Sequence, residues 1–373
     1  MTAPEESPIP VLLMVRTLTA GGTERQMTEL ARSLDRAAFQ PHVACFVESG
    51  FRAEELRACG VPIVEIQLRS FMKPHALAAA RRLGRYIRQH GIRLVHTFDY
   101  PANIFGVPAA RFAGVRVLSS QRGYRTMYAA KYRRLLRLSD KLAHGIVVNC
   151  EAMRRHLVED YAVPERKIHL CYNGIDTSVF YPGGGRGTAA RRDSETAGTV
   201  SVLRPEKGVR LLVEAFAQVH AARPDSRLLV VGSGPCSGEI IGEAESSGVR
   251  EACTFEPATS EVARRLRELD IFVLPSYSEA LSNSLMEAMA CGCACIASRV
   301  GGNPELIEDG VNGVLFEKGN ARDLAEKLRL LFDRPDLRAC YGTRAAARIR
   351  EQFPLARSAA RMEEIYRRFL TAE

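Results

Sequence analysis

The chain has 373 residues, 46% of them hydrophobic and 25% charged, and these ordinary values exclude an intrinsically disordered or membrane-spanning protein. Its length exceeds what one hydrophobic core usually serves, so we expect two domains. The first residues hold two acidic side chains and no basic one ahead of a short apolar run. This pattern indicates no secretory signal and favours a cytoplasmic protein.

The net charge of +9 is concentrated in the first half of the chain. Residues 1–182 contain 26 Lys and Arg against 16 Asp and Glu, a net charge of +10, whereas residues 183–373 contain 26 against 27. A basic half favours an acidic partner, such as phospholipid headgroups, a lipid-linked phosphate or nucleic acid.

The ten cysteines are expected to be reduced thiols, because several stand inside apolar runs of a long chain. Cys291, Cys293 and Cys295 lie close together, but alternate strand residues share a face only in pairs. No histidine lies nearby to complete a tetrahedral zinc site. We therefore predict no metal site.

Short β-rich runs alternate with helical patterns through the first half of the chain. Strands are predicted near residues 11–16, 42–47, 61–66, 92–98, 115–120, 144–149 and 167–172. This alternation is typical of βαβ units around a parallel sheet.

Residues 124–142 predict a basic amphipathic helix in which cations are interleaved with Tyr and Leu. The cations are Arg125, Lys131, Arg133, Arg134, Arg137 and Lys141. We favour an ordinary packed helix with a solvated charged face, and the alternative is an element that lies on an anionic membrane.

The second half repeats the alternation after a Gly- and Arg-rich stretch, residues 182–198, which predicts a flexible surface loop between domains. Strands are predicted near residues 199–204, 227–232, 252–255, 270–275, 293–298 and 313–316, followed by helices. The predicted fold is α/β, with two doubly wound, Rossmann-like domains that face each other across a cleft. The domains comprise residues 1–182 and 183–352, and residues 353–373 form a helix that packs back toward the first domain.

Two carboxylates, Glu279 and Glu287, stand where a predicted strand passes into a helix. Ligands bind at such junctions in open α/β sheets. A carboxylate there accepts hydrogen bonds from two sugar hydroxyls, and the N–H groups of the helix start face phosphate or sugar oxygens. The pattern therefore favours a nucleotide sugar.

A structural explanation competes with that one. Ser276-x-x-Glu279 and Ser284-x-x-Glu287 both have the spacing of a capping box, in which the glutamate only satisfies a helix terminus.

Two other loops carry groups suited to an anion. Gly21 and Gly22 precede a helix that is predicted to start at Glu24, with Thr23 and Gln26 as its cap, and they permit a close approach to its N–H groups. The alternative is a simple tight turn.

The second of these loops holds Arg204 and Lys207 after the first strand of the second half. Two cations there would neutralise a diphosphate leaving group, although a solvated cation pair is the alternative.

Six motifs together resemble glycosyltransferase family 4, the retaining enzymes of GT-B fold. The motifs are GGTERQ (21–26), NGID (173–176), RPEKG (204–208), VVGSGP (230–235), SEALSNSLMEAMACG (278–292) and GGNPELIEDGVNG (301–313). Their order and spacing match the family over nearly the whole chain. The resemblance implies metal-independent transfer of a sugar, with retained anomeric configuration and no cofactor, from a nucleotide-diphosphate sugar. The implied acceptor is a glycan or lipid-linked molecule in polysaccharide or envelope glycoconjugate synthesis.

The resemblance also implies roles for individual residues. Glu287 would hold the ribose hydroxyls and Glu279 the donor sugar, while Arg204 and Lys207 would meet the diphosphate. The remaining residues implied for donor binding are Gly21, Gly22, Gly232, Ala280, Leu281, Ser282 and Asn283. The implied catalytic set is Arg204, Lys207 and Glu279.

The chain departs from the family pattern at three places. Val202 stands where the family usually has an arginine, and Arg204 is expected to substitute for it. Arg122 stands where many members have a histidine, and it would bind the acceptor or a phosphate because arginine is no base at neutral pH. Ala-Leu-Ser follows Glu279 where Gly-Leu-Pro is common.

Further acceptor-side candidates are His96 and Asp99, at the end of a predicted strand. For His96 we favour a structural role, since polar residues at strand ends often only close the sheet.

Two other functions have some support in the sequence. A dinucleotide-dependent oxidoreductase is suggested by residues 230–238, but the third glycine arrives one position late and the segment follows the second strand of its domain. A nucleic-acid-binding protein is suggested by the basic half, but no signature of such proteins supports it. We expect no nucleic-acid partner and a peripheral contact with the inner face of an anionic membrane.

Overall fold

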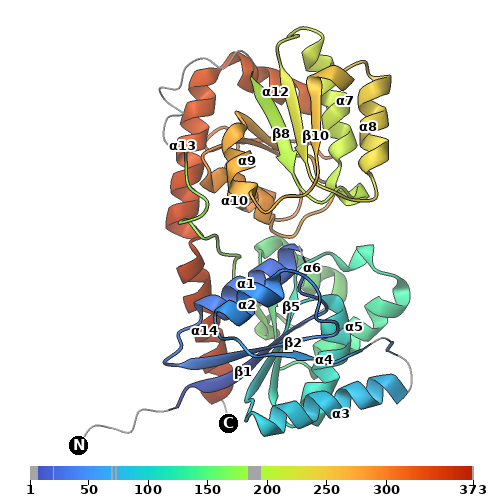
Figure 1. Ribbon diagram of the computed structural model, residues 1–373, viewed down its shortest axis with the longest axis vertical. Helices are drawn as coiled ribbons and strands as arrows, with labels where there is room; N and C mark the ends of the chain where they lie inside the picture. The colour runs from blue at the N-terminus through green and yellow to red at the C-terminus, as the bar shows by residue number, and fades with distance from the viewer. Residues whose placement is uncertain (1–6, 20, 69, 72–73, 184–194, 372–373) are drawn as a thin grey trace, which may run out of the picture. The chain divides into compact units, whose positions relative to one another are not determined.

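The computed structural model describes residues 7–19, 21–68, 70–71, 74–183 and 195–371. The chain divides into two compact units (Figure 1). The first comprises Met1–Gly174 with Leu355–Glu373, and the second comprises Ile175–Pro354.

The first unit is built on a parallel sheet of seven strands. Their order is β3 (Ile63–Glu65), β2 (Phe39–Cys45), β1 (Ile9–Val15), β4 (Leu94–Thr97), β5 (Arg116–Gln121), β6 (Gly145–Val148) and β7 (Ile168–Leu170). The strand order reverses between β1 and β4, which makes this position the switch point of a doubly wound sheet.

Helices cover both faces of this sheet. They are α1 (Gly22–Ser33), α2 (Arg52–Ala58), α3 (Pro74–Gln89), α4 (Tyr100–Phe112), α5 (Ala130–Leu142), α6 (Glu151–Tyr161) and α14 (Leu355–Thr371). Strand β1 shows why its sequence is a continuous apolar run. Val11 and Leu13 pack in one core cluster with residues of α1, α2 and α14, and Leu12 and Met14 pack in the other with residues of α3 and α4.

Helix α14 closes the core of the first unit although it comes from the far end of the chain. Met362, Ile365 and Tyr366 are buried against the sheet. The Tyr366 hydroxyl lies 2.8 Å from His96 Nδ1 on β4, so a hydrogen bond joins the helix to the sheet. The first unit is therefore discontinuous in sequence.

The second unit contains a parallel sheet of six strands with the same type of order. These are β10 (Cys253–Glu256), β9 (Arg227–Val231), β8 (Thr196–Val200), β11 (Ile271–Leu274), β12 (Ala294–Ser298) and β13 (Val314–Phe316). Its helices are α7 (Val209–His220), α8 (Ser237–Ser246), α9 (Val262–Glu268), α10 (Asn283–Ala290), α11 (Asn303–Leu306), α12 (Ala321–Asp333) and α13 (Pro335–Gln352). The α/β fold with two parallel-sheet, Rossmann-like domains is confirmed, and each predicted strand has a counterpart among the described residues.

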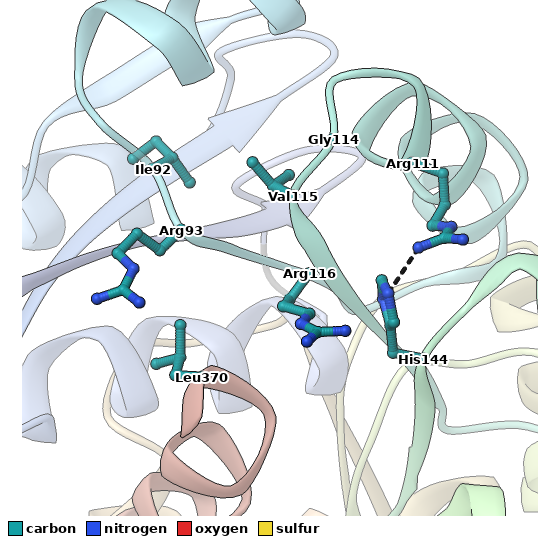
Figure 2. Close-up of a pocket in the computed structure, with 8 residues that line it drawn as sticks. All are labelled: Ile92, Arg93, Arg111, Gly114, Val115, Arg116, His144 and Leu370. Atoms are coloured by element: carbon teal, nitrogen blue, oxygen red, sulfur yellow. Dashed lines mark hydrogen bonds between the residues drawn. The ribbon is translucent and has the colours of Figure 1, made fainter. Parts of the chain in front are cut away.

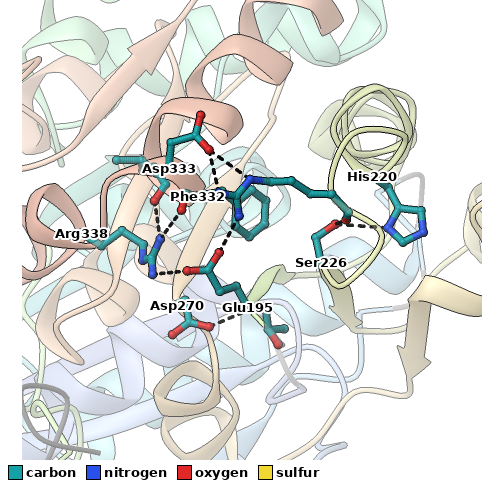
Figure 3. Close-up of polar contacts among 10 residues, drawn as sticks. Glu195, His220, Ser226, Asp270, Phe332, Asp333 and Arg338 are labelled. Carbon is teal, nitrogen blue, oxygen red and sulfur yellow. Dashed lines mark hydrogen bonds and ion pairs between the residues drawn. The ribbon is translucent and has the colours of Figure 1, made fainter. Parts of the chain in front are cut away.

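An ion-pair network fixes the start of β8 to the helices around it (Figure 3). Glu195 pairs with Arg338 of α13 and with Arg223, which follows α7, and Arg223 also pairs with Asp333 at the end of α12. Asp270 accepts a hydrogen bond from the Thr196 amide. Ion pairs and a hydrogen bond from several neighbouring elements thus fix the start of β8.

The boundary between the units falls earlier than the predicted Pro182. Ile175 donates its amide to the Phe353 carbonyl, and Tyr181 lies under the Arg267 guanidinium of α9, 4.9 Å from the ring centre. These contacts assign residues 175–182 to the second unit. Of the predicted interdomain loop, residues 184–194 lie outside the described residues, and β8 begins within its remainder.

The predicted helix over residues 124–142 is interrupted. Residues Arg125–Met127 form a short 3-10 turn, and α5 begins only at Ala130. Arg125 does not belong to a solvated face, because its guanidinium is buried and makes two hydrogen bonds of 2.6 and 2.7 Å to Asp140. The outer face of α5 instead presents Leu135 and Leu138, which are 39% and 51% exposed.

Candidate functional site

The loops that follow β8, β9, β11 and β12 gather at the carboxyl edge of the second sheet. β8 and β11 are neighbours there, and the strand order reverses between them. Both features mark the place where open α/β sheets bind ligands.

Close backbone packing holds these loops together. Gly208 has a φ of +63°, and a Cβ at this position would overlap the Pro275 carbonyl oxygen. Gly301 has a φ of +52°, and a Cβ there would overlap the Glu279 carbonyl oxygen. Only glycine combines this conformation with this approach, so both loops are fixed by their glycines.

The central feature of the site is a contact between Lys207 and Glu279. Lys207 Nζ lies 2.6 Å from Glu279 Oε1, and Ser276 Oγ donates to the same oxygen at 2.7 Å. The Glu279 side chain is 8% exposed and that of Lys207 is 24% exposed. Since both hydrogen bonds go to Oε1, Oε2 accepts none from the described residues. One oxygen of Glu279 is therefore anchored and the other is available.

Two backbone contacts place these side chains. The Tyr277 amide donates to the Glu206 carbonyl at 2.8 Å, which joins the loop after β8 to the loop after β11. The Gly302 amide donates to the Ala280 carbonyl at 2.7 Å, which joins the loop after β12 to the same segment.

The capping-box explanation of the two glutamates is wrong. Helix α10 begins at Asn283 and its cap is Ser282, whose Oγ accepts from the Leu285 amide at 3.3 Å. Glu287 lies too far along the helix to be the box partner of that cap, and its side chain is buried at 4% exposure. No helix starts beside Ser276, which instead orients Glu279 through its hydroxyl.

The rest of the predicted donor segment lies between these two glutamates. Ala280, Leu281 and Ser282 are buried, and Asn283 is half-buried. The amides of Ala280 and Ser282 donate to no acceptor among the described residues. They are available to an oxygen of a ligand.

Arg204 does not join the Lys207 and Glu279 pair. It precedes the short turn Pro205–Lys207, its side chain is 60% exposed, and its nearest carboxylate is Glu206 at 3.9 Å. It is a surface cation on the same loop.

Gly232 and Gly234, after β9, have a packing role. A Cβ at Gly232 would overlap the Ser201 carbonyl oxygen, and one at Gly234 would overlap the Leu203 carbonyl oxygen. These glycines therefore let the loop after β9 lie directly on the loop after β8. β9 is the second strand of its unit, which removes the basis for a dinucleotide fingerprint.

The predicted start of the first helix is corrected. α1 begins at Gly22 with Gly21 as its cap residue, and no side chain caps it. Gln26 is not a cap, because its buried side chain donates to the Gly174 carbonyl at 3.0 Å and accepts from the Gly174 amide. A Cβ at Gly21 would overlap the Glu24 carboxylate, so this carboxylate already lies at the helix start. An anionic ligand at Gly21 and Gly22 would have to displace it.

His96 lies in the interior of the first unit. Its side chain is wholly buried, Nδ1 contacts the Tyr366 hydroxyl at 2.8 Å, and Nε2 contacts Ser120 Oγ at 2.9 Å. Burial and the nearby Arg122 hold the pKa of His96 well below its usual range. It is a structural histidine and leaves no ring nitrogen for an acceptor.

Asp99 serves as the cap of α4. Its carboxylate accepts from the amides of Ala102 and Arg16, both at 2.8 Å, and burial raises its pKa to about 6. Both of its oxygens therefore have structural partners.

Arg122 is the acceptor-side candidate with unused hydrogen-bonding capacity. Its guanidinium lies 5.3 Å from the centre of the Phe98 ring, and Nη1 donates to Asn173 Oδ1 at 2.8 Å. Burial lowers its pKa to about 10, so it stays protonated at neutral pH. Its buried Nε has no hydrogen-bond partner among the described residues.

The sequence does not predict the contact of Ser276 with Glu279 or that of Asn173 with Arg122. The spacing of Ser276 suggests only a helix cap, and Asn173 stands out only as part of the NGID motif. A signal existed for Asn173, since a motif of small and polar residues directly after a strand marks a carboxyl edge. No helix of the described ranges is long and apolar enough to span a membrane. In the same ranges, no group of three or more His, Cys, Asp and Glu side chains could hold a metal ion.

Comparisons with known proteins agree with this geometry. The family model "Glycosyl transferases group 1" matches residues 186–348, and the model "Glycosyltransferase Family 4" matches residues 20–179. The two models thus cover the two units in turn.

Two individual relatives are glycosyltransferases by name or form glycosyl products by name. The chain is 35% identical to the D-inositol 3-phosphate glycosyltransferase of Segniliparus rotundus over 184 residues, 46% of this chain and 40% of that protein. It is 25% identical to the N-acetyl-alpha-D-glucosaminyl L-malate synthase of Bacillus anthracis over 366 residues, 93% of this chain and 94% of that protein.

Among solved structures, HepE of Anabaena in complex with UDP-glucose has a TM-score of 0.85 at 19% identity, covering 96% of this chain and all of that one. This likeness concerns the fold. The two family models, one on each unit, show that the chain belongs to the group 1, family 4 glycosyltransferases and is a glycosyl-transferring enzyme.

Proposed function

We propose that this enzyme moves a sugar from a nucleotide-diphosphate sugar to a hydroxyl of a glycan or lipid-linked acceptor, with retained anomeric configuration and without a metal ion or other cofactor. The observation that carries the proposal is the ion pair between Lys207 and Glu279 at the carboxyl edge of the second sheet. In the proposal Glu279 binds the sugar of such a donor, and Lys207 binds its diphosphate.

Glu279 is prepared to bind the donor sugar. Lys207 and Ser276 hold Oε1, which fixes the carboxylate in one orientation and leaves Oε2 to accept from a sugar hydroxyl. A carboxylate that is ordered beforehand loses little entropy when the sugar binds.

Lys207 is prepared to stabilise the leaving group. An ammonium group has three N–H donors, and Glu279 takes one of them among the described residues. Breaking the bond between the sugar and the diphosphate places negative charge on the diphosphate oxygens. A cation already held in position stabilises this charge without reorganisation during the reaction. The exposed Arg204 on the same loop adds a second cation.

Glu287 completes the donor site in the proposal. Its carboxylate lies within α10, the helix that follows the Glu279 loop, and a carboxylate accepts two adjacent hydroxyls of a ribose. The available amides of Ala280 and Ser282 would meet sugar or phosphate oxygens between the two glutamates.

The relatives suggest which donors and acceptors to examine first. HepE binds UDP-glucose, so UDP sugars precede GDP and ADP sugars. The names of the two curated relatives contain inositol 3-phosphate and malate, which are small anionic hydroxyl compounds. These two acceptors belong in the panel beside glycan and lipid-linked ones. The proposed setting is polysaccharide or envelope glycoconjugate synthesis in the cytoplasm.

The test combines donor binding with turnover. UDP or another nucleoside diphosphate should raise the Tm, since a ligand that binds the native state stabilises it. Lys207→Ala should lower kcat about 100-fold and weaken diphosphate binding, because one pre-placed donor is removed. Glu287→Ala should weaken nucleotide binding at least about tenfold, the effect of losing hydrogen bonds to a charged group. The anomeric configuration of the product, read by NMR, tests retention.

Lys327→Ala is the matched control, because it removes the same charge from α12, a helix of the same unit that carries none of the proposed site residues. Unchanged turnover in Lys207→Ala, or a Tm that no nucleoside diphosphate raises, would contradict the proposal.

A further inference from the structure

A pocket of about 490 Å³ lies at the amino edge of the first sheet, the edge opposite to Asp99 (Figure 2). Four basic side chains line it: Arg93, Arg111, Arg116 and His144. None of the described residues that line it is acidic. The pocket belongs to the first unit, whereas the proposed donor site belongs to the second.

The fold brings these four side chains together from separate elements. Arg93 directly precedes β4 and Arg116 begins β5, and the Arg116 amide donates to the Arg93 carbonyl at 3.3 Å. Arg111 lies in the last turn of α4, and His144 directly precedes β6. Adjacent parallel strands thus place their first side chains beside the end of a helix.

Two of the arginines that line this pocket carry charge that no carboxylate of the described residues neutralises. Within the described part of the chain, neither Arg93 nor Arg111 forms an ion pair with an Asp or Glu. Burial and the cations Arg111, Arg116 and Lys167 lower the pKa of His144, so its ring is neutral at pH 7. The groups that face the imidazole are therefore cationic, and the pocket has a positive potential.

The pocket also has more hydrogen-bond donors than acceptors. Arg111 Nη1 lies 2.6 Å from His144 Nε2, the contact drawn in Figure 2, and the Val117 amide lies 2.9 Å from His144 Nδ1. A neutral imidazole carries one proton, so its two nitrogens cannot both accept. One of these contacts joins two donors. An incoming acceptor would relieve this mismatch.

We infer that the pocket binds the phosphate group of a phosphorylated organic molecule, either a soluble phosphomonoester or a phospholipid headgroup. A phosphate offers several acceptor oxygens, and guanidinium groups match its geometry with paired hydrogen bonds. Ile92, Val115 and Leu370 supply an aliphatic wall for the organic part of the ligand. Arg111 would turn from His144 to the phosphate, and Arg93 and Arg116 would complete the contact.

The first experiment measures binding of glycerol 3-phosphate, with glycerol for comparison, by calorimetry at constant ionic strength. The phosphate compound should bind and glycerol should not. Arg93→Gln and Arg111→Gln should each weaken binding about tenfold or more, since each removes a charge-assisted contact. Arg85→Gln, an exposed arginine on α3, makes the same charge change elsewhere and should have no effect.

A second arm identifies the source of the phosphate. Co-sedimentation with phosphatidylglycerol vesicles, against phosphatidylcholine vesicles, is measured for the same variants. Loss of vesicle binding in Arg93→Gln and Arg111→Gln would assign the pocket to a lipid headgroup. Tight binding of glycerol 3-phosphate with unchanged vesicle binding would assign it to a soluble ligand.

The inference fails if the variants bind both probes as the unchanged protein does, or if neither probe binds. The Tm increase caused by a nucleoside diphosphate should be the same in all these variants. A failure of the pocket is thereby distinguished from a failure of the donor site.

Discussion

Asp99 links the ionisation of one side chain to the stability of the first unit. Burial raises its pKa to about 6, above the ordinary value of 3.8, so the folded state holds the proton more tightly than the unfolded state. The contribution of Asp99 to the free energy of unfolding is therefore most favourable at low pH, and it declines as the pH rises from about 4 to about 6. Asn in its place keeps an acceptor for the Ala102 amide and does not ionise. We predict that the Tm of Asp99→Asn minus that of the unchanged protein increases between pH 4 and 7.

The control for this prediction is Asp225→Asn, an exposed carboxylate in the second unit, whose Tm difference should not change with pH in this way. Asp99→Ala also removes the cap of α4, so its free energy of unfolding should lie about 1 kcal/mol below that of Asp99→Asn at every pH. If the Tm difference for Asp99→Asn stays constant or falls with pH, then folding does not raise the pKa of this carboxylate.

Some residue roles were predictable and others were not. The position of Glu279 and Glu287 at a carboxyl edge follows from the strand and helix patterns around them. The hydrogen-bond partner of His96 does not follow from local patterns, since Tyr366 stands 270 residues away. The Lys207 contact to Glu279 joins loops 72 residues apart, and only the common switch point brings them together.

At the scale of elements, the strands were predicted well, and the start of the first helix was predicted poorly. Buried parallel strands are short apolar runs between polar turns, and this signal is local. A helix start depends on which residue first leaves the extended conformation. Gly21 takes that place in α1, where the Thr23 spacing suggested otherwise. Ser282 takes it in α10, and only the capping-box alternative pointed to Ser284.

The outer face of α5 carries the prediction of membrane contact. Leu135 and Leu138 are exposed there beside Arg134 and Arg137, a combination typical of helices that lie on an anionic surface. We predict that the protein co-sediments with vesicles containing phosphatidylglycerol, that salt weakens this binding, and that a Leu135→Ser, Leu138→Ser double variant reduces it several-fold.

Leu330→Ser on α12 is the comparison for this helix, because it removes an exposed leucine from the less basic unit. Equal binding to phosphatidylcholine vesicles, or no loss in the double variant, would leave α5 as an ordinary packed helix with a solvated outer face.

At the scale of the whole molecule, each unit encloses its own hydrophobic core. The core of the first unit depends on α14, and that of the second includes Phe332 of α12. Tyr366 is wholly buried, packs edge-on against Phe39 at 5.9 Å and contacts His96. Replacing a large buried aromatic residue with alanine costs about 3 to 5 kcal/mol. We predict that Tyr366→Ala lowers the thermal transition of the first unit and that Phe332→Ala lowers that of the second.

Calorimetry with and without a nucleoside diphosphate separates the two transitions, because the proposed donor site lies in the second unit and the ligand should raise only its transition. Tyr366→Ala should then keep a ligand-dependent transition near its original temperature, and Phe332→Ala should lose stability in that same transition. If either substitution lowers both transitions equally, the two cores unfold as one cooperative body, and the division at Gly174 and Pro354 describes geometry without describing stability.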